Sequence, residues 1–188
     1  MSKKLLSPEY VLLGLLDLQP MHGYELHQRL AMELGQIWHV SLSQVYNILK
    51  RLESKDLIYG VVNTQENLPD RRILHLTESG SNHYEAWLRS PSSSSVRSIR
   101  MEMTSRLYFA FNRDPEIAHQ LIHDQIQVID DGLKILEGKL ENLPTEQMFN
   151  RFGLELRIRQ LNSVIEWLIE CRQKLHEYKA KEKVILAR

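Results

Sequence analysis

The pattern of hydrophobic and polar positions changes near the middle of the chain. Up to residue 89, short runs with a helical period of apolar residues are followed by two runs rich in β-branched residues. From residue 98, apolar positions recur in regular steps of four and three. Small polar residues and a proline separate the two patterns, which is typical of a linker. The sequence therefore predicts a domain at 1–89, a Ser-rich linker at 90–97 and a second domain at 98–188.

Three helices are predicted in the first domain. Ser7-Pro8 is typical of a helix start, with Ser as the cap and Pro at the first helical position. A second helix carries leucines at four-residue spacing and stops near Gly35. The third begins with Ser41, followed three residues later by Gln44, which is the spacing of a capping box. Its apolar period predicts that it continues to about Lys55.

Two strand-like runs follow the third helix. Residues 57–62 and 72–77 are rich in β-forming side chains, and the polar residues 63–71 between them are predicted to be a loop. Thr77 then caps a further helix. Three helices followed by a two-stranded hairpin is the order of a winged helix-turn-helix, an α+β arrangement in a mostly α protein. In that fold the third helix enters the major groove of DNA.

The third helix is predicted to carry DNA-binding side chains on the face opposite its apolar stripe. This outer face comprises Ser43, Gln44, Tyr46, Asn47, Lys50 and Arg51. Asn and Gln can pair bidentately with adenine, whereas Lys and Arg suit phosphates. The alternative interpretation of Lys50 and Arg51 is that they are ordinary solvated helix charges. Their clustering on one face favours the DNA interpretation.

A heptad pattern characterises the second domain. Apolar residues step by four and three from Ile122 to Leu143, and the alternation returns after Pro144 from Leu154 to Leu175. We predict two long antiparallel helices joined by a short connection. Their apolar length exceeds what so small a domain needs, which indicates pairing with a second copy of the chain. The predicted dimerisation residues are Ile126, Ile129, Leu133, Leu136, Leu154, Ile158, Leu161, Ile165 and Leu168.

Composition narrows the classes of function. The 188 residues hold 24 Lys and Arg against 24 Asp and Glu, so the formal net charge is zero. Any contact with DNA must therefore depend on the placement of charges rather than on bulk charge. No apolar run approaches the roughly 18 residues that cross a bilayer. With a single cysteine, Cys171, the chain forms no internal disulfide. We expect a soluble, cytoplasmic protein with no membrane contact.

Signatures of catalysis and of metal binding are missing from the sequence. It contains no Gly-rich phosphate loop and no Gly-x-Ser-x-Gly elbow. His119 and His123 stand four residues apart, but the sequence shows no third ligand for a metal beside them. We therefore expect no enzyme activity, no metal and no cofactor.

Motifs in the first domain resemble the PadR family of bacterial transcriptional regulators. They are Leu13-Gly14-Leu15-Leu16, Pro20-Met21-His22-Gly23-Tyr24-Glu25-Leu26, Ser43-Gln44-Val45-Tyr46, Leu49-Lys50-Arg51-Leu52-Glu53, Leu57-Ile58, Arg71-Arg72 and Leu76-Thr77-Glu78-Ser79-Gly80. The second domain, with Leu107-Tyr108-Phe109-Ala110 and its heptad helices, is similar to the C-terminal helical domain of the subgroup related to virulence activators. Leu42 and Leu74 depart from the family, which often has proline and an aromatic residue there.

The resemblance implies a dimeric winged-helix protein that binds a palindromic operator, most often as a repressor. Carried over residue by residue, it implies DNA-facing roles for Tyr24, Ser43, Tyr46, Asn47 and Lys50, with Arg71 and Arg72 on the wing. It also suggests a small apolar or phenolic effector held by aromatic residues near the junction, among them Trp87, Tyr108, Phe109 and Phe111. The alternative function is a protein-interaction adaptor on the same scaffold. Basic and amide residues on the third helix favour DNA over the adaptor.

Overall fold

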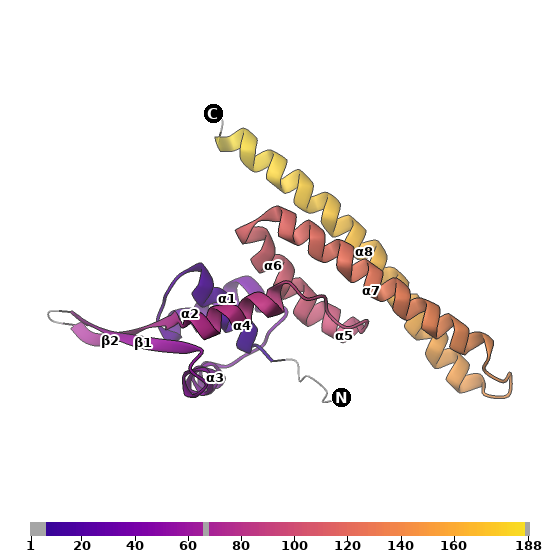
Figure 1. Ribbon diagram of the computed structural model, residues 1–188, viewed down its shortest axis with the longest axis horizontal. Coiled ribbons are helices and arrows are strands. Elements are labelled where there is room, and N and C mark those ends of the chain that lie inside the picture. The colour runs from indigo at the N-terminus through magenta and orange to yellow at the C-terminus, as the bar shows by residue number, and fades with distance from the viewer. Residues whose placement is uncertain (1–6, 66–67, 187–188) are drawn as a thin grey trace. The chain divides into compact units, whose positions relative to one another are not determined.

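The computed structural model describes the backbone of residues 7–65 and 68–186 and the side chains of residues 7–62 and 72–178. The chain divides into two compact units, Met1–Arg89 and Ser90–Arg188. The first holds α1 (Glu9–Leu18), α2 (Gly23–Leu34), α3 (Leu42–Ser54), β1 (Ile58–Gln65), β2 (Leu68–Leu76) and α4 (Glu78–Leu88) (Figure 1). The second holds α5 (Val96–Ser98), η1 (Ile99–Met103), α6 (Thr104–Arg113), α7 (Pro115–Glu141) and α8 (Met148–Leu186).

Helix α1 forms the centre of the first unit. Six consecutive residues from Val11 to Leu16 are buried, and the helix packs against α2, α4 and β2. Its start differs from the prediction, because Pro8 occupies the cap position and the helix begins at Glu9. The Ser7 hydroxyl still accepts a hydrogen bond from the Glu9 backbone N–H, at 3.4 Å. The proline therefore stands one residue outside the helix.

Both ends of α3 are fixed by local hydrogen bonds. The predicted capping box is confirmed, since Ser41 Oγ accepts from the Gln44 N–H at 3.3 Å and Gln44 Oε1 accepts from the Ser41 N–H at 2.8 Å. At the other end Asp56 has a φ of 54°, and the Leu57 N–H donates to the carbonyl of Leu52 at 3.0 Å. These two features form a Schellman turn, which ends the helix and leads the chain into β1.

The β1–β2 hairpin is longer than predicted. Its antiparallel register pairs Ile58 with Leu76 and Val62 with Arg72, and it continues to the pair Gln65 and Leu68. The expectation that residues 63–71 form a loop is therefore wrong for residues 63–65 and 68–71, and residues 66 and 67 lie outside the described residues. The ladder consists of backbone hydrogen bonds, so polar side chains do not prevent a strand from continuing. We call this hairpin the wing.

The second unit contains the predicted antiparallel helical hairpin. In Figure 1, α7 and α8 lie side by side and are joined by a short turn. Their lengths are 27 and 39 residues, so α8 continues beyond the start of α7. Ile129, Leu133 and Leu136 of α7 are buried, as are Leu161 and Leu168 of α8. The heptad pattern is thus used within one chain.

A buried polar cluster holds part of the Ser-rich segment inside the second unit. Gln125 Oε1 accepts from the Ser92 backbone N–H at 2.7 Å, and Gln125 Nε2 donates to the Ser92 carbonyl at 3.0 Å. Arg106 donates to the Ser92 hydroxyl at 2.5 Å and to Glu102 at 3.2 Å. Ser92 and Arg106 are each 2% exposed and Gln125 is fully buried. Ser92 is therefore an anchored residue within a segment whose composition predicts a linker.

Replacing Gln125 with alanine should destabilise the protein. The substitution removes both partners of the Ser92 backbone and leaves a buried N–H and C=O unsatisfied, which costs about 2–4 kcal/mol in total. Urea unfolding of the full chain measures this loss. The matched control is Gln120→Ala on the same helix, because Gln120 is exposed and its amide donates to the exposed side of the helix, to Asp124. Equal losses for the two variants would contradict the role given to Gln125.

Candidate nucleic-acid interface

The outer face of α3 is exposed as the sequence predicts. Val45, Ile48, Leu49 and Leu52 point into the core of the first unit. The exposed residues of the helix include Ser43, Gln44, Tyr46, Asn47, Lys50 and Arg51. These six side chains are accessible to a ligand that approaches α3 from solvent.

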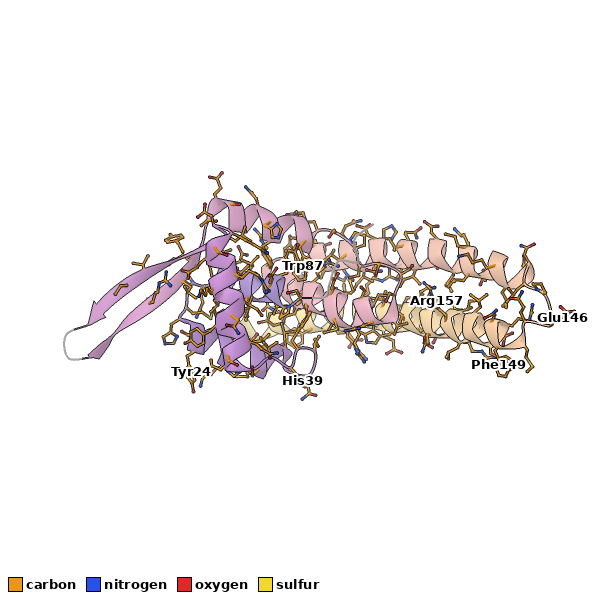
Figure 2. All side chains as sticks on the ribbon, turned by 90° about the horizontal axis from the view of Figure 1, so that it is seen from below. Tyr24, His39, Trp87, Glu146, Phe149 and Arg157 are labelled. Atoms are coloured by element: carbon orange, nitrogen blue, oxygen red, sulfur yellow. The ribbon has the colours of Figure 1, made fainter. Side chains whose placement is uncertain are left out.

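A groove of about 570 Å³ runs along this face and is lined by three elements. Its polar lining residues are His22 at the start of α2, Tyr24 of α2, Tyr46, Asn47, Lys50 and Glu53 of α3, and Arg72 of β2. Tyr24 and Tyr46 are 51% and 50% exposed, and Figure 2 shows Tyr24 at the outer surface of its unit. The two helices approach closely because Gly23 has no side chain, and a Cβ there would lie 2.8 Å from Tyr46 Cε1. The groove therefore brings five of the predicted DNA-facing residues together.

The basic residues of this surface differ in their partners. Arg51 is paired with Glu9, whose carboxylate also lies 3.7 Å from the Lys55 ammonium. Arg72 is paired with Glu53. Lys50 makes no ion pair with any residue whose side chain the structure describes. Among the described basic side chains of this face, Lys50 thus differs from Arg51 and Arg72 in having no ion pair.

The predicted amide readers also differ. Gln44 uses its carbonyl oxygen in the capping box, so a bidentate contact with adenine competes with the helix cap. Asn47 lines both the groove described above and a neighbouring groove of about 610 Å³, whose lining includes Gln44 and Arg51. The Asn47 amide thus faces both grooves, whereas the Gln44 carbonyl oxygen is engaged in the helix cap. The side chain of Arg71 lies outside the described residues, so its predicted role has no structural counterpart.

Sequence reasoning did not assign roles to Glu9, Glu53 and Gly60, all of which contact the predicted DNA-binding side chains. Glu53 stands in the last turn of α3, where the partial negative charge of the helix end disfavours a carboxylate. This position was a signal that a cation lies nearby. The partner, Arg72, comes from the wing and could not be identified from helix periodicity.

The predicted dimerisation residues lie largely inside the hairpin of one chain. Ile129, Leu133, Leu136, Leu161 and Leu168 are buried there, and the other four are half-buried: Ile126, Leu154, Ile158 and Ile165. A different set of apolar side chains on α8 is exposed, with Phe149 at 79%, Phe152 at 53% and Leu156 at 58%. Figure 2 shows Phe149 and Glu146 near the tip of the hairpin.

The aromatic residues predicted to hold an effector belong to two separate units. Trp87 is buried in the first unit, where its ring stacks on Tyr10 at a centroid distance of 5.1 Å. In the second unit Phe109 is buried, and the rings of Tyr108 and Phe109 meet edge to face at 4.9 Å. Packing therefore accounts for the burial of Trp87 and Phe109.

Metal binding, membrane crossing and a reactive cysteine can each be checked against the described part of the chain. Its His, Cys, Asp and Glu side chains form no group of three or more that could hold a metal ion. None of its helices combines the length and the apolar character that a membrane crossing requires. Burial raises the pKa of the Cys171 thiol, although Lys174 nearby opposes the shift. That thiol is therefore protonated at neutral pH and a weak nucleophile.

Comparison with known proteins assigns a family to both parts of the chain. Residues 12–86 match the family described as transcriptional regulator PadR-like, and residues 99–176 match the virulence activator alpha C-terminal family. A negative transcriptional regulator, PadR of Bacillus subtilis, is 30% identical over 137 residues, which cover 72% of this chain and 74% of the relative.

Two crystal structures of Bacillus subtilis PadR are also similar. The complex with operator DNA has 24% identity and a TM-score of 0.42, with 89% of this chain and 98% of that chain covered. The complex with p-coumaric acid has 23% identity and a TM-score of 0.39, with 90% and 98% covered. On the family matches and the identity to the Bacillus subtilis regulator, the chain belongs to the PadR-like family of transcriptional regulators.

Proposed function

We propose that this protein is a sequence-specific DNA-binding regulator whose α3 enters the major groove of an operator. The observation that carries the proposal is the groove in which α2, α3 and the wing present Tyr24, Asn47, Lys50 and Arg72 together. Such a surface combines a base-reading amide, a phosphate-binding cation and two half-exposed tyrosines. The Bacillus subtilis relative is a negative regulator, which supports repression as the outcome.

The residues of α3 take distinct roles in this proposal. Asn47 reads a base edge, because its amide can donate to and accept from adenine at once. Lys50, one turn further along the same face, binds a phosphate and carries no sequence information. A protein-interaction adaptor would not need a base-reading amide and a cation at this spacing. The DNA proposal uses both.

Substitutions at Asn47 and Lys50 should separate the two roles. Operator fragments are first selected from the organism's own DNA, and affinities are then compared with those for scrambled duplexes. Asn47→Ala should lower affinity for the selected fragment by about 1–3 kcal/mol and leave scrambled DNA nearly unaffected. Lys50→Ala should weaken binding to both and flatten the salt dependence by about one unit of slope. Equal losses on both duplexes for Asn47→Ala would remove it from the reading role.

We also propose that the protein acts as a homodimer on a palindromic operator. Because the chain is neutral, one half-site should bind weakly, and two linked copies would supply the affinity. The buried heptad residues pair α7 with α8, and the exposed apolar residues of α8 include Phe149, Phe152 and Leu156, which we propose as the face for a second copy. These residues follow steps of three and four and so share one side of α8.

Phe152→Glu combined with Leu156→Glu should yield a folded monomer. Two carboxylates in an apolar interface are costly to bury, whereas the hairpin core is left intact. Sedimentation equilibrium should show loss of the dimer, and affinity for the selected fragment should fall by tenfold or more, as expected when bivalent binding is lost. The control is Asn162→Glu, which adds a carboxylate on another exposed side of α8. A double variant that stayed dimeric would place the interface elsewhere.

The regulator is further proposed to respond to a small apolar or phenolic effector. The Bacillus subtilis relative has been crystallised with p-coumaric acid, which supports a phenolic acid as the first compound to test. Adding it should change tryptophan fluorescence and weaken binding to the selected fragment. Trp87→Phe, which keeps an aromatic ring in the core, is the control that shows whether Trp87 is the tryptophan whose emission changes. A panel of phenolic compounds that altered neither fluorescence nor affinity would contradict this proposal.

A further inference from the structure

One ion pair connects α3 to the wing. Arg72 Nη2 lies 2.5 Å from Glu53 Oε1, and Arg72 Nη1 donates to Glu53 Oε2 at 3.0 Å. Two nitrogens on two oxygens form a bidentate fork, which fixes the plane of the guanidinium as well as its position. The Glu53 side chain is 26% exposed and that of Arg72 is 55% exposed. The more buried carboxylate therefore holds the more exposed cation at the edge of the groove.

Arg72 reaches Glu53 because Gly60 leaves its path open. Gly60 is paired with Leu74, two residues from Arg72 on β2, so Gly60 and Arg72 are diagonal neighbours on one face of the wing. A Cβ at Gly60 would overlap the Arg72 Nε and lie 2.7 Å from its Cζ. The φ of Gly60 is not positive. The backbone therefore does not require glycine there, but the arginine side chain does.

The carboxylate of Glu53 stands in an unfavourable place for a DNA-binding surface. It lies in the last turn of α3, against the helix dipole, and it lines the same groove as Lys50 and Asn47. A negative charge at this position repels the phosphates of DNA and so disfavours binding. Glu9 has the same relation to Arg51 at the other groove. Acids thus neutralise two of the arginines that the sequence assigns to phosphates.

We propose that Glu53 is a specificity-determining residue that acts through Arg72. The inference rests on the proposed DNA-binding function. Non-operator DNA is bound through phosphate neutralisation alone, and an arginine already paired with a carboxylate contributes little to it. On the operator, base contacts by α3 add affinity that does not depend on Arg72, and the fixed guanidinium needs no further ordering. Glu53 therefore lowers affinity for non-operator DNA more than affinity for the operator.

The first test is Glu53→Gln, measured on a scrambled duplex and on the best selected fragment over a range of salt concentrations. The substitution keeps the shape of the side chain and releases the charge of Arg72. Affinity for the scrambled duplex should rise roughly three- to tenfold at low salt, and the salt slope should steepen by about one. The selected fragment should gain less, so the ratio of the two affinities falls.

The control is Glu33→Gln, which removes an equal charge from a comparable pair. Glu33 accepts from Arg29 at 2.9 Å and its side chain is 23% exposed. It stands nine residues from Tyr24 on α2 and so lies on the opposite side of that helix. The inference fails if Glu53→Gln leaves the affinity ratio unchanged or alters it no more than Glu33→Gln does. Failure of the proposed function would instead appear in the wild-type protein, as equal affinity for both duplexes; the scrambled-duplex measurement still tests Glu53 in that case.

Gly60→Ala supplies a second test with no change in charge. The new Cβ displaces the flexible Arg72 side chain from Glu53, so circular dichroism and thermal unfolding should remain close to those of the wild type. The affinity ratio should fall, because the guanidinium is no longer held. A folded Gly60→Ala protein with the wild-type ratio would show that Glu53 acts only as a bulk charge, which would overturn the inference.

Discussion

The burial of one face of α3 fixes the chemistry of the other face. Val45, Ile48, Leu49 and Leu52 are buried in the first unit, and each is worth about 1.5–3 kcal/mol relative to exposure. No polar contact on the outer face approaches that sum, so the core sets the rotation of the helix about its axis. The capping box and the Schellman turn fix its two ends. Asn47 faces solvent because the core leaves it no other orientation.

The charge balance of the chain has a local counterpart on this surface. A neutral protein could place all its cations against DNA and its acids elsewhere, but here Glu9 and Glu53 stand beside Arg51 and Arg72. Such pairs reduce the long-range attraction to any polyanion. Under the proposed function, affinity for DNA then depends on contacts that form only when the groove fits the operator. The neutral net charge and the paired arginines therefore have the same effect: both limit the positive charge that this member of a family of transcriptional regulators presents to a polyanion.

Local sequence signals predict the helices and strands, but they do not predict contacts between residues that are far apart in the sequence. Ser41 and Gln44 identified a capping box because both partners lie within one turn. The fork between Glu53 and Arg72 joins residues nineteen positions apart through the wing register, which side-chain pattern does not specify. The sequence predicts a loop at residues 63–71 because strand propensity reflects side-chain packing, whereas the ladder at residues 63–65 and 68–71 needs only backbone hydrogen bonds. Ser92 has the composition of a linker, and its burial depends on Gln125, thirty-three residues away.

The heptad pattern is also ambiguous, because a seam of apolar residues does not show whether the helix packed against it belongs to the same chain or to a second copy. Here α7 meets α8 of the same chain, so the pairing forms at any protein concentration. In the proposed dimer, a second copy uses the exposed apolar face of α8, and its association depends on concentration. In the proposed dimer, bivalent binding to an operator would therefore respond to the amount of regulator in the cell, while the fold of each subunit would not. Folding and dimerisation can differ in this way because the buried and exposed apolar faces of α8 are different sets of residues. Leu161 and Leu168 lie on the buried face, and Phe152 and Leu156 lie on the exposed face.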